Sequence, residues 1–126
     1  MMYMLDTNIC IYVINKRPPH ILNTFESVGS DSLCISVITQ AELQYGVEKS
    51  SNPARNQAIL DEFITRVFVM PWNRNAAITY GRIRKELERK GMVIGNMDLM
   101  IAAHAFSEAG KYILVTNNIR EFQRIA

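Results

Sequence analysis

Residues 4–8, Met4-Leu5-Asp6-Thr7-Asn8, decide the fold, because an apolar run that begins at Met1 stops there at a carboxylate. The run is short and unbroken, which predicts a buried strand of a parallel sheet. Asp6 then lies at the carboxyl end of that strand, where open α/β sheets bind their ligands. An aspartate in this position can also cap the helix expected in the next apolar run, 9–14. From these residues alone, both roles of Asp6 stay open.

Short apolar runs alternate with segments of helical pattern along the rest of the chain. Further strands are predicted at 33–36, 67–70 and 112–116. Helices are expected at 40–49, 53–66, 75–90 and 98–106, with shorter ones at 9–14, 20–25 and 117–122. Either Ser36 or Thr39 opens the helix at 40–49. The alternation predicts one domain over residues 1–126, a three-layer α/β/α arrangement with a central parallel sheet. The segment 98–106 is apolar almost all round, so we expect a buried helix beside the sheet.

The composition restricts the class of protein more than it restricts the activity. No apolar run reaches the roughly 20 residues of a membrane-spanning helix, and the N-terminus lacks the basic segment of a secretory signal. Cys10 and Cys34 both lie in apolar runs, which favours packed thiols in a reducing compartment. We therefore expect a cytoplasmic protein without membrane attachment. The formal net charge of +2 neither requires nor excludes a nucleic-acid partner.

Acidic or amide side chains stand at points where the surrounding pattern gives no packing reason for them. Asp6 ends the first strand, and Glu42 lies in the first turn of the helix that follows the second strand. Asp98 lies at the start of the apolar helix, and Asn118 and Glu121 follow the last strand. Because parallel strands end at one sheet edge, these side chains can meet there. Like charges gather when a cation neutralises them, and an all-oxygen set suits Mg²⁺ or Mn²⁺. Each residue also has an ordinary explanation as a helix cap, a first-turn acid or a turn residue.

Four motifs follow one another along nearly the whole chain. They are Leu5-Asp6-Thr7-Asn8; Ala41-Glu42-Leu43 with Tyr45-Gly46; Ile94-Gly95 with Asp98 and Leu99-Met100-Ile101-Ala102-Ala103-His104-Ala105; and Val115-Thr116-Asn117-Asn118 with Arg120-Glu121-Phe122. In this order they resemble the motifs of PIN-domain ribonucleases, and they are most similar to the VapC toxins of bacterial toxin–antitoxin pairs. The resemblance implies a magnesium-dependent endoribonuclease that forms homodimers. It also implies a VapB-type antitoxin that inserts residues into the acidic pocket.

The resemblance assigns roles by position. Asp6, Glu42 and Asp98 match the metal-binding acids, so the resemblance implies that they bind Mg²⁺, with Mn²⁺ as a substitute. Asn118 matches a fourth catalytic position that is often Asp, and Glu121 matches a more variable acid nearby. The amide of Asn118 supplies no charge, which departs from the family pattern and puts a fully occupied second metal site in doubt. The last strand and tail of such toxins do not follow Phe122, so we expect a chain truncated at its C-terminal end.

Candidates for contact with the substrate lie in sequence beside the acids. They are Thr7, Asn8, Lys16, Arg17, Arg120, Arg124 and Glu121. The hydroxyl of Thr7 either orients the attacking water, as the resemblance suggests, or caps the first helix. Gly46 follows Glu42 by one helical turn, so it leaves space above the carboxylate.

Two further features have structural explanations. Cations crowd the predicted helix 75–90, and the pairs Arg82–Glu86, Arg84–Glu88 and Glu86–Lys90 are spaced i,i+4. This spacing favours a solvated, ion-paired face over contact with an RNA backbone. His104 falls within the apolar helix and is expected to be a packed core histidine.

The leading hypothesis is a VapC-type endoribonuclease that cuts tRNA, including the initiator. A phosphatase with an aspartyl nucleophile is an alternative, but Asp6-Thr7-Asn8 has an amide where such enzymes have a second acid. The other alternative is a non-catalytic α/β binding module whose acids are only helix caps. That module would bind no metal ion, so a magnesium titration separates it from the nuclease.

Overall fold

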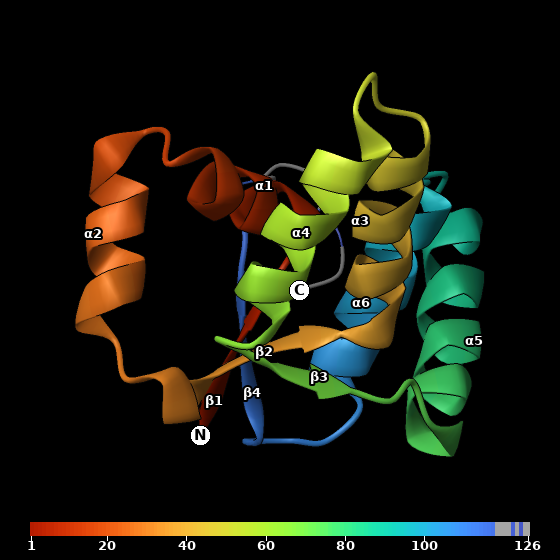
Figure 1. The fold of residues 1–126 in the computed structure, drawn as a ribbon. Coiled ribbons are helices and arrows are strands. Elements are labelled where there is room, and N and C mark those ends of the chain that lie inside the picture. The colour runs from red at the N-terminus through yellow and green to blue at the C-terminus, as the bar shows by residue number, and fades with distance from the viewer. Residues whose placement is uncertain (118–121, 123, 125–126) are drawn as a thin grey trace.

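Parallel strands with helices on both sides build the fold in the computed structural model, which describes residues 1–117, 122 and 124. The strands are β1 (Met2–Leu5), β2 (Leu33–Ser36), β3 (Phe68–Met70) and β4 (Tyr112–Val115). The helices are α1 (Thr7–Asn15), α2 (Pro19–Ser27), α3 (Val37–Glu48), α4 (Pro53–Ile64), α5 (Arg74–Arg89) and α6 (Asn96–Phe106), with a short 3₁₀ turn at Ser30–Ser32. Figure 1 shows these helices around a central sheet, so the predicted α/β/α architecture is confirmed.

The sheet has the order β3-β2-β1-β4, and every pair of neighbours is parallel. β1 is central, with Tyr3 opposite Leu33 of β2 and Leu5 opposite Val115 of β4. The chain moves outward from β1 to β3 and then returns to the other side of β1 for β4. The order therefore reverses between β1 and β4, which is where sheets of this kind open a crevice for ligands.

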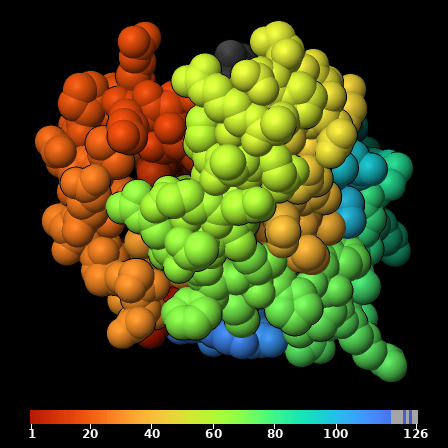
Figure 2. Space-filling model, viewed as in Figure 1, coloured from red at the N-terminus to blue at the C-terminus, as the bar shows by residue number. Residues whose placement is uncertain are grey.

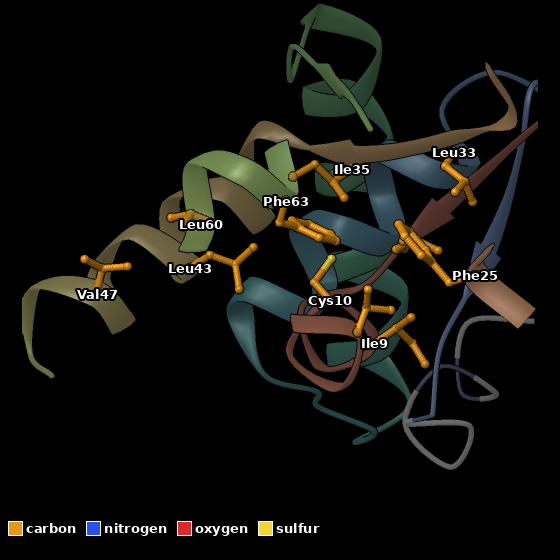
Figure 3. Close-up of a cluster of buried hydrophobic side chains, with 11 residues drawn as sticks. Ile9, Cys10, Phe25, Leu33, Ile35, Leu43, Val47, Leu60 and Phe63 are labelled. Carbon is orange, nitrogen blue, oxygen red and sulfur yellow. The ribbon is translucent and has the colours of Figure 1, made fainter. Parts of the chain in front are cut away.

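Alternate residues of the strands pack against different helices. Leu5, Leu33 and Ile35 belong to a core that α1, α2, α3 and α4 complete. In this core the rings of Phe25 and Phe63 stack with centroids 6.1 Å apart (Figure 3). On the other face, Met4, Cys34 and the α6 residue Ala105 form a second buried cluster. This alternation follows from the period of two along a strand and covers both faces of the sheet.

Most predicted boundaries agree with the structure within two residues, and one does not. α3 begins at Val37, three residues before the predicted start, because Ser36 is its N-cap and accepts a hydrogen bond from the Ile38 N–H at 3.1 Å. Glu42 therefore lies in the second turn of α3, and its placement in the first turn was wrong. The helical turn predicted at 117–122 falls mostly outside the described residues.

The buried groups agree with the sequence-based expectations. Cys10 and Cys34 are free thiols with no exposed surface, as expected for packed cysteines. His104 is 2% exposed, so its prediction as a core histidine is confirmed. Across the described part of the chain, no helix is long and apolar enough to cross a membrane.

Candidate active site

Asp6 is fixed at the point where two neighbouring strands end. Its Oδ1 accepts a hydrogen bond from the Ile9 N–H at 2.9 Å, which makes Asp6 the N-cap of α1. Its Oδ2 accepts one from the Thr116 hydroxyl at 2.5 Å, and Thr116 directly follows β4. The capping role is therefore confirmed. The second hydrogen bond ties the same carboxylate to the neighbouring strand, across the position where the strand order reverses.

Capping alone does not account for the burial of Asp6, whose exposed fraction is only 2%. Desolvation raises the pKa of Asp6, and the hydrogen bonds from Thr116 and Ile9 oppose that rise only in part. A solvated aspartate would cap α1 equally well without this cost. A buried carboxylate in this state gains stability from a proton or from a cation beside it.

Thr7 connects Asp6 to Glu42. The Thr7 hydroxyl donates to Oε1 of Glu42 at 2.5 Å, across the contact between α1 and α3. Thr7 is the first residue of α1 and Asp6 is the cap, so the alternative that Thr7 caps the helix is wrong. Glu42 is half-buried, and one of its oxygens is thus held in place. The structure thus places Glu42 against the residue that follows Asp6, at the carboxyl end of β1.

Asp98 lies in the first turn of α6, where the helix dipole favours a negative charge. The N-cap of α6 is Gly95, so the alternative that Asp98 is the cap is wrong. A Cβ on Gly95 would lie 3.8 Å from Oδ2 of Asp98, which places this half-buried carboxylate over the start of its own helix. Among the described residues, no three His, Cys, Asp or Glu side chains lie close enough to hold a metal ion. Asp98 is therefore not gathered into one cluster with Asp6 and Glu42.

A cleft of about 490 Å³ adjoins Glu42 between α1, α3 and α4. Gly46 lines it, and a Cβ at this position would meet no atom within 4 Å, which confirms that the glycine leaves open space. Arg55 of α4 lines the same cleft. It also lines a groove of about 630 Å³ between α1, α2 and α4, which Figure 2 shows as a notch between the orange and yellow-green surfaces. The two hollows therefore share Arg55 as part of their walls.

The other predicted site residues are not all close to the acids. Asn8 is exposed in the first turn of α1. Lys16 and Arg17 follow the opposite end of α1, about 13 Å away along the helix axis at about 1.5 Å per residue. Lys16 also lines the groove between α1, α2 and α4, and the contact of Lys16 and Arg17 with substrate stays a prediction. Asn118, Arg120 and Glu121 lie outside the described residues.

Sequence reasoning missed two residues of this region. Thr116 could have been found, because it follows a strand at the same edge of the sheet as Asp6. The rule that ligands bind at the carboxyl ends of parallel strands, which we call the strand-end rule, applies to both residues. Arg55 had no such signal. Only the packing of α4 against α1 and α3 brings it into the cleft beside Glu42.

Several known proteins are similar to this chain in sequence and in fold. Residues 3–126 match the family model described as PIN domain. The chain is 49% identical over 126 residues to ribonuclease VapC2 of Rickettsia felis, covering 99% of this chain and 92% of that protein. It is 49% identical over 123 residues to the tRNA(fMet)-specific endonuclease VapC of Salmonella typhimurium, covering 98% and 91%. The crystal structure of DNA-bound VapBC from Salmonella typhimurium matches with a TM-score of 0.91 at 48% identity, over 99% of this chain and 92% of that chain.

Proposed function

The chain belongs to the PIN-domain family, and we propose that it is the endoribonuclease toxin of a VapBC toxin–antitoxin pair. The predicted resemblance to VapC proteins is confirmed. Relatives named as ribonucleases support hydrolysis of RNA as the reaction. The structural observation that carries the proposal is Asp6, a buried carboxylate at the carboxyl end of the central strand that Thr7 connects to Glu42.

PIN-domain nucleases generally depend on divalent metal ions. We propose that Asp6, Glu42 and Asp98 hold Mg²⁺, with Mn²⁺ as a substitute, although the three carboxylates are not clustered closely enough for one ion in this structure. The donor atoms are all carboxylate oxygens, which suit these ions. No ion pair among the described residues neutralises the buried Asp6. A cation held there supplies Lewis-acid stabilisation of the negative charge that grows on the phosphate during hydrolysis.

The side chains of the site fix the acids before substrate arrives. Thr116 and the Ile9 N–H hold the two oxygens of Asp6. Thr7 holds Oε1 of Glu42, which leaves Oε2 of that carboxylate for a ligand. The open space at Gly46 gives an RNA strand access to Glu42. Asp6 and Glu42 are thus preorganised, and these two carboxylates need no rearrangement at the moment of reaction.

We propose tRNA as the substrate, with the initiator tRNA preferred. The support is the relative named as a tRNA(fMet)-specific endonuclease. The solved VapBC complex supports a VapB-type antitoxin as the partner, and homodimer formation stays a prediction. A tRNA substrate places the proposed activity in the cytoplasm.

The choice of substrate is tested with the purified protein, Mg²⁺ and two transcripts, the initiator tRNA and an elongator methionine tRNA. We expect a discrete cut in the initiator, little cutting of the elongator, and no cutting in EDTA. Asp31→Asn, which changes an exposed acid just before the amino end of β2, is the matched control and should cut like the wild type. Equal cutting of both transcripts would contradict the proposed preference for the initiator tRNA. If neither transcript is cut, the proposed tRNA endonuclease activity is contradicted.

A further inference from the structure

The structure divides the five cations near the end of α5 into two kinds. Three form ion pairs with acids of the same helix: Arg84 with Glu88 at 3.3 Å, Arg89 with Glu86 at 2.6 Å, and Lys90 with Glu86 at 3.7 Å. The predicted pair between Arg82 and Glu86 was wrong, because Arg89 donates to both oxygens of Glu86. No ion pair among the described residues involves Arg82 or Lys85.

Arg82 and Lys85 share one groove, which we call the α5 groove. They are three residues apart, so they lie on the same face of the helix. The α5 groove has a volume of about 500 Å³, and its lining residues are Arg82, Ile83, Lys85, Glu86, Leu87, Lys90 and Arg124. Its one described acid, Glu86, is already paired with Arg89 and Lys90. The groove therefore carries an excess of positive charge.

The α5 groove borders the connection that leads to Asp98. Arg124 lines the groove and donates to the Val93 carbonyl at 2.6 Å. Val93 lies two residues before Gly95, the N-cap of α6, whose first turn contains Asp98. The Tyr80 hydroxyl of α5 also donates to Asn96 at 2.6 Å. Figure 1 shows α5 and α6 side by side, so a strand held in the groove lies next to the helix that carries an active-site acid.

We infer that the α5 groove binds the phosphate backbone of the RNA substrate. The inference rests on the proposed function and adds a binding surface to it. Asp6, Glu42 and Asp98 repel a polyanion, so attraction for RNA must come from cations outside the acidic site. Cations without an ion-pair partner attract phosphates without first breaking a salt bridge, and each contact releases counterions from the nucleic acid. The position of the groove beside the start of α6 favours RNA over an acidic segment of a protein.

The test measures binding of tRNA by fluorescence anisotropy in EDTA, over a series of salt concentrations. The test variant is Arg82→Gln/Lys85→Gln. The matched control is Arg84→Gln/Lys111→Gln, which removes the same charge from ion-paired residues that do not line the α5 groove. For the test variant we expect the slope of log K against log salt to become shallower by about 1.4, at about 0.7 per phosphate contact. Affinity near 0.1 M salt should fall by about tenfold, whereas the control should bind like the wild type.

Equal slopes for the test variant and the wild type would overturn the inference, as would equal losses in the test variant and the control. If the test variant binds tRNA normally but loses affinity for a Glu-rich peptide, the groove serves a protein partner and the RNA assignment is wrong. Where the double variant does not fold, each single variant replaces it, with an expected change of about 0.7 in slope.

Binding in EDTA needs no cleavage, so the two proposals can fail separately. A wild-type protein that binds tRNA through the groove but does not cut it with Mg²⁺ would refute the proposed function alone. A wild-type protein that cuts tRNA, with the slope unaffected by the test variant, would refute the groove alone.

Discussion

Asp6 has two roles, and they have opposite effects on the stability of the folded protein. As the cap of α1 it satisfies the Ile9 N–H, and as a buried acid it has a pKa raised by desolvation. Between the ordinary pKa of 3.8 and the raised one, the folded chain binds more protons than the unfolded chain. The charged Asp6 therefore destabilises the metal-free fold above the raised pKa, and this loss disappears as the pH falls to the ordinary value.

Asp6→Asn should accordingly stabilise the protein in EDTA at pH 7.5. The new side chain can still accept from Ile9, and its amide can donate to the Thr116 hydroxyl, which accepts as well as donates. We expect thermal melts to show a rise of about 4 °C, which corresponds to about 1 kcal/mol in a domain of this size. The rise should shrink toward pH 4. A lower melting temperature than wild type at pH 7.5 would mean that the capping hydrogen bonds outweigh the burial of charge.

Thr7 positions Glu42 through one hydroxyl, so a variant without the hydroxyl can be compared with a control variant that keeps it. Thr7→Val keeps the shape but removes the donor to Oε1 of Glu42, whereas Thr7→Ser keeps the donor. A hydrogen bond to a charged group contributes about 1.5–3 kcal/mol. Steady-state cleavage of tRNA should therefore fall about ten- to a hundredfold in Thr7→Val and by much less in Thr7→Ser. Equal activity of the two variants would show that the hydroxyl has no role at Glu42.

At the scale of elements, α3 and α6 are joined through two buried side chains. Ser36 Oγ accepts from the Ile38 N–H, and it lies 2.7 Å from Nδ1 of His104. Ser36 Oγ can donate to Nδ1 of His104 or accept from it, according to which ring nitrogen carries the proton. Burial lowers the pKa of His104; the negative charge of Glu108 raises it by less, and the positive charge of Lys111 lowers it slightly further. The helices that carry Glu42 and Asp98 are thus connected by a buried contact, and the burial favours a neutral imidazole.

This contact predicts a loss of stability in mild acid. Between the lowered pKa of His104 and its ordinary value of 6.5, the unfolded chain binds more protons than the folded one. Its contribution is therefore complete above pH 6.5 and is lost as the pH falls through the lowered pKa. Urea unfolding should show a smaller loss between pH 7.5 and pH 5.5 in His104→Asn than in the wild type. The same loss in both proteins would assign the acid sensitivity to other groups.

The sequence predicted the elements well where pattern and propensity agreed. The start of α3 was missed because Val37, Ile38 and Thr39 are β-branched and continue the apolar run of β2, which favours a strand. The Ser36 cap and tertiary packing override that preference. The predicted pair of Glu86 with Lys90 is confirmed, but Arg89 was missed as a second partner. Spacing allows both Arg82 at i−4 and Arg89 at i+3, and only side-chain geometry selects Arg89.

For the site, the strand-end rule placed Asp6 correctly and also applies to Thr116. It could not place Lys16 and Arg17, since they are close to Asp6 in sequence and separated from it by the length of α1. The strand-end rule could not identify Arg55 either, because no local sequence pattern indicates how α4 packs on α1. Proximity in sequence is thus a poor guide to the site wherever a helix intervenes.

At the scale of the whole molecule, the strand order determines where the candidate active-site residues lie. β4 returns to the far side of β1, so Thr116 can reach Asp6 at the reversal of strand order. Glu42 arrives from the helix after β2, and Asp98 from the helix before β4. Four segments distant in sequence therefore contribute to one edge of the sheet. The central claim of this account is that the acids at this edge act through their charge on RNA cleavage, rather than through packing.

Cleavage of tRNA by Asp98→Asn in Mg²⁺, scored against circular dichroism of the same preparation, tests that claim most directly. The substitution nearly preserves shape and removes one charge, and Asp98 is not the cap of α6. We expect a wild-type spectrum and a fall in rate of at least about a hundredfold, because several kcal/mol are lost and each 1.36 kcal/mol is tenfold in rate. A folded Asp98→Asn protein that cuts tRNA at the wild-type rate would contradict the account.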